Sequence, residues 1–340
     1  MLLLRDIFQY QTIRSLAEYI SGLEQEVFIS IPKTLKKENY PLSSAQQRMY
    51  FLYEFDKEST TYNIPGVFEI SGDLDIVHLK AVFLKLTERH ESLRTVFELG
   101  SSGVVQRVLA DYKFEIPFYQ VSESEIKKHI GDFVRPFNLS LELPFRVSIL
   151  SVGESKYILL VDMHHIISDG VSMEVLLRDF WSLYQRETLN SLRIQYKDYA
   201  VWQQSDVHKE QLAKERLYWE NQYSDKVETL NLPYDYSRPK IKESSGSNIS
   251  FNLSELQLVG LRLISSDNDS TMFMVMLSLF KLLLSKLSNQ YDIIVGTPIS
   301  GRHHFDLERT VGMFVNTLAL RTSPSGDKFY KDYLSEVKET

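Results

Sequence analysis

The sequence predicts an α/β protein with two lobes. Short apolar segments of strand-like composition alternate with longer segments whose apolar residues recur at helical spacing. This alternation occurs twice, and a loop-like stretch at residues 224–247 separates the two series. With 340 residues, 43% of them hydrophobic, the chain can form one large domain or two ordinary ones, each with its own core.

The first series is expected to form a lobe over residues 40–220. It begins with a helix at SSAQQRMYFL (43–52), for which Ser43 or Ser44 can provide the N-cap. The segments that follow are a strand at 67–70, a helix at 74–90, strands at 95–99 and 104–109, a helix from 125 that ends by Pro136, strands at 145–150 and 157–164, and a helix at 171–187. A helical stretch rich in aromatic residues, 196–223, leads out of this lobe.

The second series is expected to form a lobe over residues 221–340. Its segments of strand or helix composition are 249–253, 256–265, 272–287, 292–300 and 314–321. Two further units precede the first lobe. Residues 1–22 contain a short amphipathic helix, and residues 23–39, with Pro32 and the charged run KTLKKEN, are expected to be a linker.

Composition and charge exclude several classes of function. Acidic residues outnumber basic ones by 45 to 38, the formal net charge is −7, and no basic stripe stands out, so nucleic acid is not an expected partner. The absence of cysteine excludes disulfides and thiolate nucleophiles, and it fits a cytoplasmic location. Neither GxGxxG nor GxxxxGK[ST] occurs. The apolar run at 272–284 is broken by Ser278 and Lys281, so no membrane span is expected.

The stretch MHHIISDGVS (163–172) contains two histidines, an aspartate and two serines, and it follows an apolar segment that is expected to be a strand. Because side chains alternate along a strand, His164 and His165 cannot both face one pocket unless the strand ends between them. Asp169 lies across a turn from His165, and Gly170 permits a close backbone approach. From spacing alone, a polar strand-to-helix connection capped by Ser168 or Asp169, a catalytic site and a metal site all remain open.

Four further motifs accompany this stretch in order. They are SSAQQRMYFL at 43–52, RHESLRTVF at 89–97, YKDYAVWQQ at 196–204 and VGMFVNTLALR at 311–321. With MHHIISDGVS they resemble the ordered motifs of condensation domains from nonribosomal peptide synthetases. The resemblance extends from Tyr40 to the end of the chain. HHxxxDG alone would indicate only the wider acyltransferase superfamily.

The resemblance also has implications at both ends of the chain. LRDIFQYQTIRSLAEYI is similar to the last helices of a peptidyl carrier domain, so residues 1–22 are expected to be a carrier remnant. The attachment motif of carriers, a serine after paired glycines, does not occur, so no phosphopantetheine is expected to be bound covalently to this chain. The last condensation-domain motifs are not found either. The second lobe is therefore expected to be incomplete, and the chain to be part of a longer synthetase.

The family resemblance implies a fold and an activity. Two chloramphenicol-acetyltransferase-like lobes would form a V-shaped pseudo-dimer, and phosphopantetheine arms of an upstream and a downstream carrier domain would enter a tunnel from opposite faces. The amine of the downstream aminoacyl thioester would attack the upstream acyl or peptidyl thioester and form a peptide bond. An adenylation domain of the same synthetase is a further implied partner. No metal is implied.

The resemblance assigns roles to individual residues. His165 would face the reacting groups and take or position the amine proton, and the backbone N–H of Gly170 would approach the oxyanion. His164 would support the structure. Asp169 would pair with an arginine, for which Arg94 is favoured over Arg89. Asn316 and Ser168 would belong to the substrate tunnel.

The resemblance also narrows the subtype and the alternatives. SSAQQRMYFL, YNIPG and RHESLRT are similar to the subtype that joins an L-configured donor to an L-configured acceptor. An epimerisation domain shares HHxxxDG, but its distinguishing motifs are not present. An inactive carrier-docking platform of the same fold would lose the second histidine or the glycine, whereas this chain keeps both.

Overall fold

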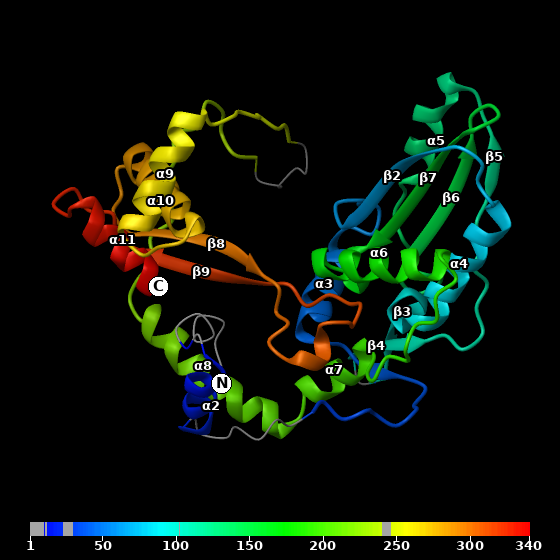
Figure 1. Ribbon diagram of the computed structural model, residues 1–340, viewed down its shortest axis with the longest axis horizontal. Helices are drawn as coiled ribbons and strands as arrows, with labels where there is room; N and C mark the ends of the chain where they lie inside the picture. Colours follow the sequence, from blue (N-terminus) through cyan, green and yellow to red (C-terminus); the bar gives the residue numbers. More distant parts are fainter. Residues whose placement is uncertain (1–9, 11, 23–29, 102, 240–245) are drawn as a thin grey trace.

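The computed structural model describes residues 10, 12–22, 30–101, 103–239 and 246–340. They form two bodies that diverge from a shared base, so the molecule has the outline of a V (Figure 1). Each body combines helices with at least one sheet. The predicted α/β class with two lobes is confirmed.

The first lobe contains a four-stranded sheet in the order β2-β7-β6-β5. Strands β2 (Asn63–Ser71), β7 (Lys156–His164) and β6 (Phe145–Ser151) are antiparallel neighbours, and β5 (Phe118–Gln120) runs parallel to β6. Asn63 is opposite His164 in this register, so the end of β7 lies beside the start of β2.

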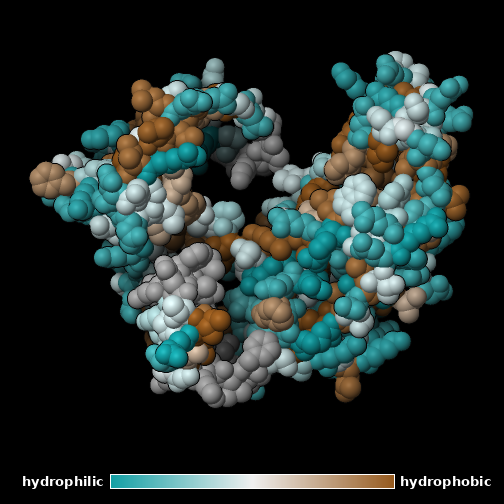
Figure 2. Space-filling model, in the orientation of Figure 1, coloured by the Kyte–Doolittle hydropathy of each residue, from teal (hydrophilic) through white to brown (hydrophobic). Residues whose placement is uncertain are grey.

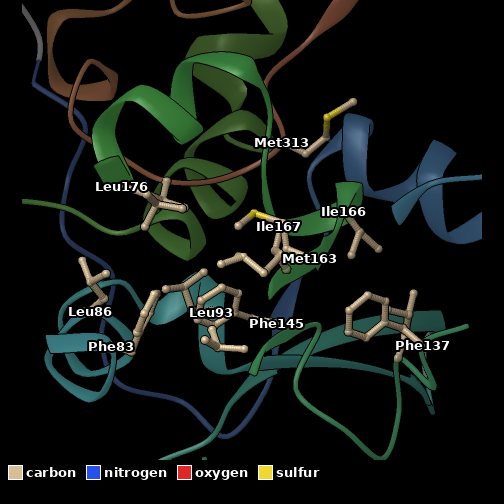
Figure 3. Packing of buried hydrophobic residues seen from close by; sticks show 14 of the residues in the cluster. Phe83, Leu86, Leu93, Phe137, Phe145, Met163, Ile166, Ile167, Leu176 and Met313 are labelled. Atoms are coloured by element: carbon tan, nitrogen blue, oxygen red, sulfur yellow. The ribbon is translucent and has the colours of Figure 1, made fainter. Parts of the chain in front are cut away.

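Side chains alternate along β7 and face two different apolar clusters. Val161 and Met163 lie in the main core with residues of α4 (Ile76–Arg89) and α6 (Gly170–Tyr184). Figure 3 shows Met163 in this core together with Phe83 of α4 and Leu176 of α6. Leu160 on the other face packs toward α5 (Ile126–Phe133). Both faces of the central strands are therefore covered, which fits the continuous apolar run that precedes the histidines.

A smaller sheet completes the first lobe, in the order β1-β4-β3. Its strands are β1 (Tyr40–Pro41), β4 (Gly103–Val108) and β3 (Thr95–Gly100), and the short helix η1 (Glu91–Arg94) precedes β3. Helix α3 (Ser44–Phe55) starts at the predicted cap: the Ser43 hydroxyl accepts from the Gln46 N–H, and the Gln46 side chain accepts from the Ser43 N–H.

The second lobe consists of α9 (Glu255–Asp267), α10 (Met272–Ser288), α11 (Tyr330–Glu339) and an antiparallel pair of strands, β8 (Ile293–Ile299) and β9 (Asn316–Thr322). Residues 249–253, which open the predicted second series, form no regular element. In the described part of the chain, no single helix is long and apolar enough to cross a membrane; α9 and α10 meet that test only as a pair bent by 108°.

Two segments connect the lobes. Helix α7 (Tyr196–Gln203) packs in the first lobe, and α8 (Asp206–Gln222) runs from it toward the second (Figure 1). Residues 300–315, with the short helix η4 (Phe305–Leu307), then lie against the first lobe, where Phe314 is buried with Tyr196. The polar groups of the site lie where this returning segment meets the first lobe.

The residues before the first lobe are only partly described. Helix α2 (Ile13–Gly22) falls in the predicted carrier remnant, while the rest of residues 1–22 except 10 and 12, and residues 23–29 of the predicted linker, lie outside the described residues. Two of the remaining linker residues are hydrogen-bonded to distant parts of the chain. Ile31 is fully buried and its N–H donates to Asp306 Oδ2 at 3.0 Å, and the Thr34 N–H donates to Asp198 Oδ1 at 2.9 Å.

Candidate active site

The candidate site is the connection between the end of β7 and the start of α6. His164 is the last residue of the strand, His165 begins the short helix η3 (His165–Ile167), and Asp169 is the N-cap of α6. The strand therefore ends between the two histidines. Strand geometry no longer requires their side chains to point to opposite faces.

His164 lies in the interior of the first lobe. It is 4% exposed, and its Nδ1 accepts a hydrogen bond from the Ile166 N–H at 3.1 Å. The rings of Tyr53 and Phe137 meet the imidazole edge-on with centroids 6.2 Å away. Burial, and secondarily the charge of His165, lower the pKa of His164 to about 4. The imidazole is thus neutral near pH 7, with its proton on Nε2, and supports the turn.

His165 is partly exposed, in contrast to its neighbour. Its backbone N–H donates to the Tyr62 carbonyl at 2.8 Å, which ties the turn to the start of β2. Its ring Nδ1 is buried, and no described residue forms a hydrogen bond with it. Nothing in the described chain therefore fixes the ring tautomer, and either nitrogen can carry the proton.

Asp169 is fully buried and binds the segment that returns from the second lobe. Its Oδ1 accepts from the Ser172 N–H and hydroxyl, both at 2.8 Å, and from Arg302 Nη2 at 3.0 Å. Its Oδ2 accepts from the Phe314 N–H at 3.1 Å. The carboxylate thus caps α6 and at the same time anchors residues 302–314.

The arginine partner of Asp169 is Arg302, so the predicted partner, Arg94, is wrong. Arg94 instead donates to the carbonyls of Thr87 and Leu109, which joins α4 to the end of β4. The second candidate, Arg89, donates to Asp179 Oδ2 at 2.7 Å. Both arginines stabilise the first lobe, and neither contacts Asp169.

The aspartate that pairs with Arg89 is Asp179. It is a buried aspartate on α6 that binds both Arg89 and His90, the first two residues of the RHESLR motif. Burial raises the pKa of Asp179, but the hydrogen bonds from His90 and Arg89 outweigh this effect and lower it to about 2. The motif therefore does pair with an aspartate of this region, ten residues beyond the expected one.

Arg302 is the site residue that sequence reasoning missed. Its guanidinium also donates to the carbonyls of Leu307 and Thr310 and lies over the ring of Phe314 at 4.1 Å. It follows directly after Gly301, whose φ of +63° and close approach to the Phe314 carbonyl require glycine. A glycine and an arginine immediately after the predicted strand at 292–300 were the available signal.

Of the remaining predicted residues, Gly170 and Ser168 belong to the same connection, and Asn316 begins β9. Gly170 is exposed and opens α6, and an added Cβ there would meet nothing within 4 Å. Ser168 is fully buried, so in this conformation its hydroxyl has no surface from which to meet a substrate. Asn316, the first residue of β9, accepts from Arg48 Nη2 at 3.2 Å.

Asn316 and Arg48 line a cavity of about 970 Å³ between α3, α7, α8 and the two strands of the second lobe. The cavity has both polar and apolar walls, and Tyr199, Trp219 and Leu318 contribute to it. Among the described residues, no three His, Cys, Asp or Glu side chains are grouped so that they could hold a metal ion. The cavity walls include guanidinium, amide, imidazole, hydroxyl and carboxylate groups.

Comparisons with known proteins agree with this geometry. A family model described as "Condensation domain" matches residues 36–340. The chain belongs to the condensation-domain family. Surfactin synthase subunit 1 from Bacillus subtilis (strain 168) is 43% identical over 338 residues, which is 99% of this chain and 9% of that protein. This condensation domain thus spans a small part of the curated relatives it matches.

Solved structures support the fold of the condensation domain. The X-domain from teicoplanin biosynthesis superposes with a TM-score of 0.83 at 22% identity, over 92% of this chain and 71% of that one. The first condensation domain of the calcium-dependent antibiotic synthetase gives a TM-score of 0.70 at 18% identity, over 89% of this chain and 74% of that one. At such identities the likeness shows the fold alone.

Proposed function

We propose that this chain catalyses peptide-bond formation between thioesters held on two carrier domains of a nonribosomal peptide synthetase. The amine of a downstream aminoacyl thioester attacks the carbonyl carbon of an upstream acyl or peptidyl thioester. A C–N bond forms, the C–S bond breaks, the upstream thiol leaves, and the amine loses a proton. Membership of the condensation-domain family supports this reaction, and the different environments of the two histidines carry the assignment of the site.

His165 is the residue that handles the proton. Imidazole is the side chain most often used for proton transfer in enzymes, and its ring nitrogen can accept or orient the proton of the attacking amine. The ring is partly exposed while its Nδ1 is buried, so Nε2 is the nitrogen that we assign to the amine. His164, neutral and enclosed by aromatic rings, cannot serve in this way.

Alignment of the reactants supplies much of the remaining acceleration. Thioesters are already activated. Holding the downstream amine in line with the upstream thioester carbonyl therefore replaces a bimolecular encounter. The N–H of Gly170, at the exposed start of α6, is the donor we assign to the developing oxyanion. The cavity with Arg48 and Asn316 is the passage we assign to one of the phosphopantetheine arms, which arrive on the partner carriers as part of the substrates.

The wider context belongs to the same proposal. The partners are an upstream carrier, a downstream carrier and an adenylation domain, in a cytoplasmic synthetase of which the chain is a part. The match to surfactin synthase covers 99% of the chain and so includes most of residues 1–35, which supports a carrier remnant before the domain. The donor and acceptor are both L-configured in this proposal.

The second lobe is proposed to be partial. Helix α10 buries Ser278, Lys281 and Ser285, whereas its large apolar side chains are exposed at alternating spacings of three and four residues, namely Phe273, Met276, Phe280, Leu283 and Leu287. A continuous apolar surface of this kind is normally covered by another part of the protein or by a partner, and we propose that further residues of the second lobe cover it. Figure 2 shows apolar surface over the upper part of this lobe.

The proposal is tested with the intact synthetase and two carriers loaded with different L-amino acids. The expected result is a dipeptidyl thioester on the downstream carrier and a free thiol on the upstream one, read by mass spectrometry. Inversion of the upstream α-carbon without transfer would instead assign an epimerisation domain. Binding of both carriers with neither reaction would assign a docking platform.

A further inference from the structure

The five motifs of the sequence meet at one irregular segment, Val311–Asn316, here called the cross-lobe segment. Its first five residues form neither helix nor strand, so their backbone polar groups find no partners in a ladder of secondary structure. Val311, Met313 and Phe314 are nonetheless buried, and buried backbone groups need hydrogen bonds. Side chains of the first lobe provide them.

Four side chains of the first lobe hold consecutive residues of the cross-lobe segment. The Ser92 hydroxyl donates to the Val311 carbonyl at 2.6 Å. The Ser172 hydroxyl accepts from the Gly312 N–H at 3.0 Å. The Tyr196 hydroxyl donates to the Met313 carbonyl. The Asp169 carboxylate accepts from the Phe314 N–H.

Tyr196 is the largest of these side chains, and it is only 2% exposed. Its hydroxyl lies 2.7 Å from Ser43 Oγ, and because it donates to the Met313 carbonyl, Ser43 is the donor in the second bond. Burial raises the pKa of Tyr196 well above its ordinary value, so the hydroxyl keeps its proton. Its ring occupies the place of a side chain at Gly312, where a Cβ would lie 1.8 Å from Cδ2.

The cross-lobe segment touches the candidate site on both sides. Met313 belongs to the same apolar core as Ile166 and Ile167, the two residues that follow His165, and Figure 3 shows all three on one side of that core. At its other end the segment stops at Asn316, which meets Arg48 at the cavity. A shift of this segment would therefore move the histidine turn and the cavity wall together.

We propose that Tyr196 is a positioning residue for peptide-bond formation, because its buried hydroxyl fixes the cross-lobe segment between the histidine turn and the second lobe. The YKDY motif then has a role of its own: it sets the relation between His165 and the residues that the second lobe contributes. Ser172 and Ser92 act with it on the neighbouring carbonyl and N–H groups. This inference rests on the proposed function.

The test is Tyr196→Phe in the intact synthetase, a change that keeps the ring and removes only the hydroxyl. We expect the single-turnover rate of transfer to fall about 10- to 100-fold, because small misplacements of reacting groups cost rates of this order. The KM for each loaded carrier should stay within about twofold, since a positioning loss acts on the transition state. Amide hydrogen exchange at Gly312 and Phe314 should become faster.

Two further variants separate positioning from general loss of stability. Tyr333→Phe removes a buried hydroxyl that lies 3.1 Å from Thr322 Oγ1 in the second lobe, and it should leave the transfer rate unchanged. Ser172→Ala should reproduce the pattern of Tyr196→Phe, with a lower rate, an unchanged KM and faster exchange at Gly312. It also serves as the test if Tyr196→Phe does not fold.

The outcomes distinguish this inference from the function on which it rests. A wild-type synthetase that transfers nothing to the downstream carrier overturns the proposed function, and the positioning role with it. An active wild type with an equally active Tyr196→Phe overturns the positioning role alone. A raised KM with an unchanged rate constant also overturns it, because the hydroxyl would then contribute to binding rather than to alignment.

Discussion

Replacing Arg302 by methionine removes the guanidinium that faces Asp169 and keeps most of the side-chain volume. The two side chains are 5% and 0% exposed, and Nη2 lies 3.0 Å from Oδ1. The substitution also removes the donors to the carbonyls of Leu307 and Thr310. It therefore breaks the ion pair between the N-cap of α6 and the segment from the second lobe.

The magnitude follows from the burial of this pair. Two unit charges at such a distance attract by about 5 kcal/mol at an effective dielectric constant of about 20. Without Arg302, the Asp169 carboxylate stays buried with only the N–H groups of Ser172 and Phe314 and the Ser172 hydroxyl as donors. Removing one partner of a buried ion pair costs about 3–5 kcal/mol, and we expect Arg302→Met to lower the free energy of unfolding by that amount.

Urea unfolding at pH 7 measures this loss, with Arg107→Met as the matched control. Arg107 pairs with Glu98, but the two side chains are 34% and 33% exposed, so this control should cost no more than about 1 kcal/mol. Combining Asp169→Asn with Arg302→Met should cost less than the sum of the single changes, by about 1–3 kcal/mol. Equal losses for Arg302→Met and Arg107→Met, or a coupling of Asp169 to Arg94 instead, would refute the reasoning.

Two glycines and one lysine provide further predictions. Gly312→Ala should destabilise the protein by about 3 kcal/mol in urea unfolding, because the new Cβ overlaps the Tyr196 ring. Gly170→Ala should change stability by less than about 1 kcal/mol, because its Cβ meets nothing within 4 Å. The opposite order would contradict the packing. Burial lowers the pKa of Lys281 to about 8 from an ordinary 10.5. Between these two pH values the unfolded state binds the proton more readily than the folded state, so the free energy of unfolding should rise with pH across that window, by about 3 kcal/mol. In Lys281→Met this rise should be absent; its persistence would show that another group causes it.

The position of the histidines could be predicted because it depends on a local rule. An apolar run long enough to be a buried strand ends at His164, so one histidine belongs to the strand and the other to the turn that follows it. The same holds for the caps, since Ser43 and Asp169 precede helices that their spacing indicates. Such features need only a few neighbouring residues.

The partner of Asp169 could not be predicted because it depends on how the two lobes meet. Arg302 is 133 positions away in the chain, in a polar loop whose composition gives no sign of burial. The family motif favours Arg94 as the partner of Asp169, but the Arg94 side chain donates to the carbonyls of Thr87 and Leu109. Likewise, nothing local indicates that Tyr196 contacts Gly312.

The transfer rate of the His165→Ala synthetase tests the central claim most directly. With both carriers loaded, we expect loading to persist while single-turnover transfer to the downstream carrier falls by about 100-fold or more, the usual contribution of a general acid or base. His129→Ala, a change on α5 beside Tyr119, serves as the control and should transfer at the wild-type rate. Dipeptide formation by His165→Ala at the wild-type rate would contradict the account.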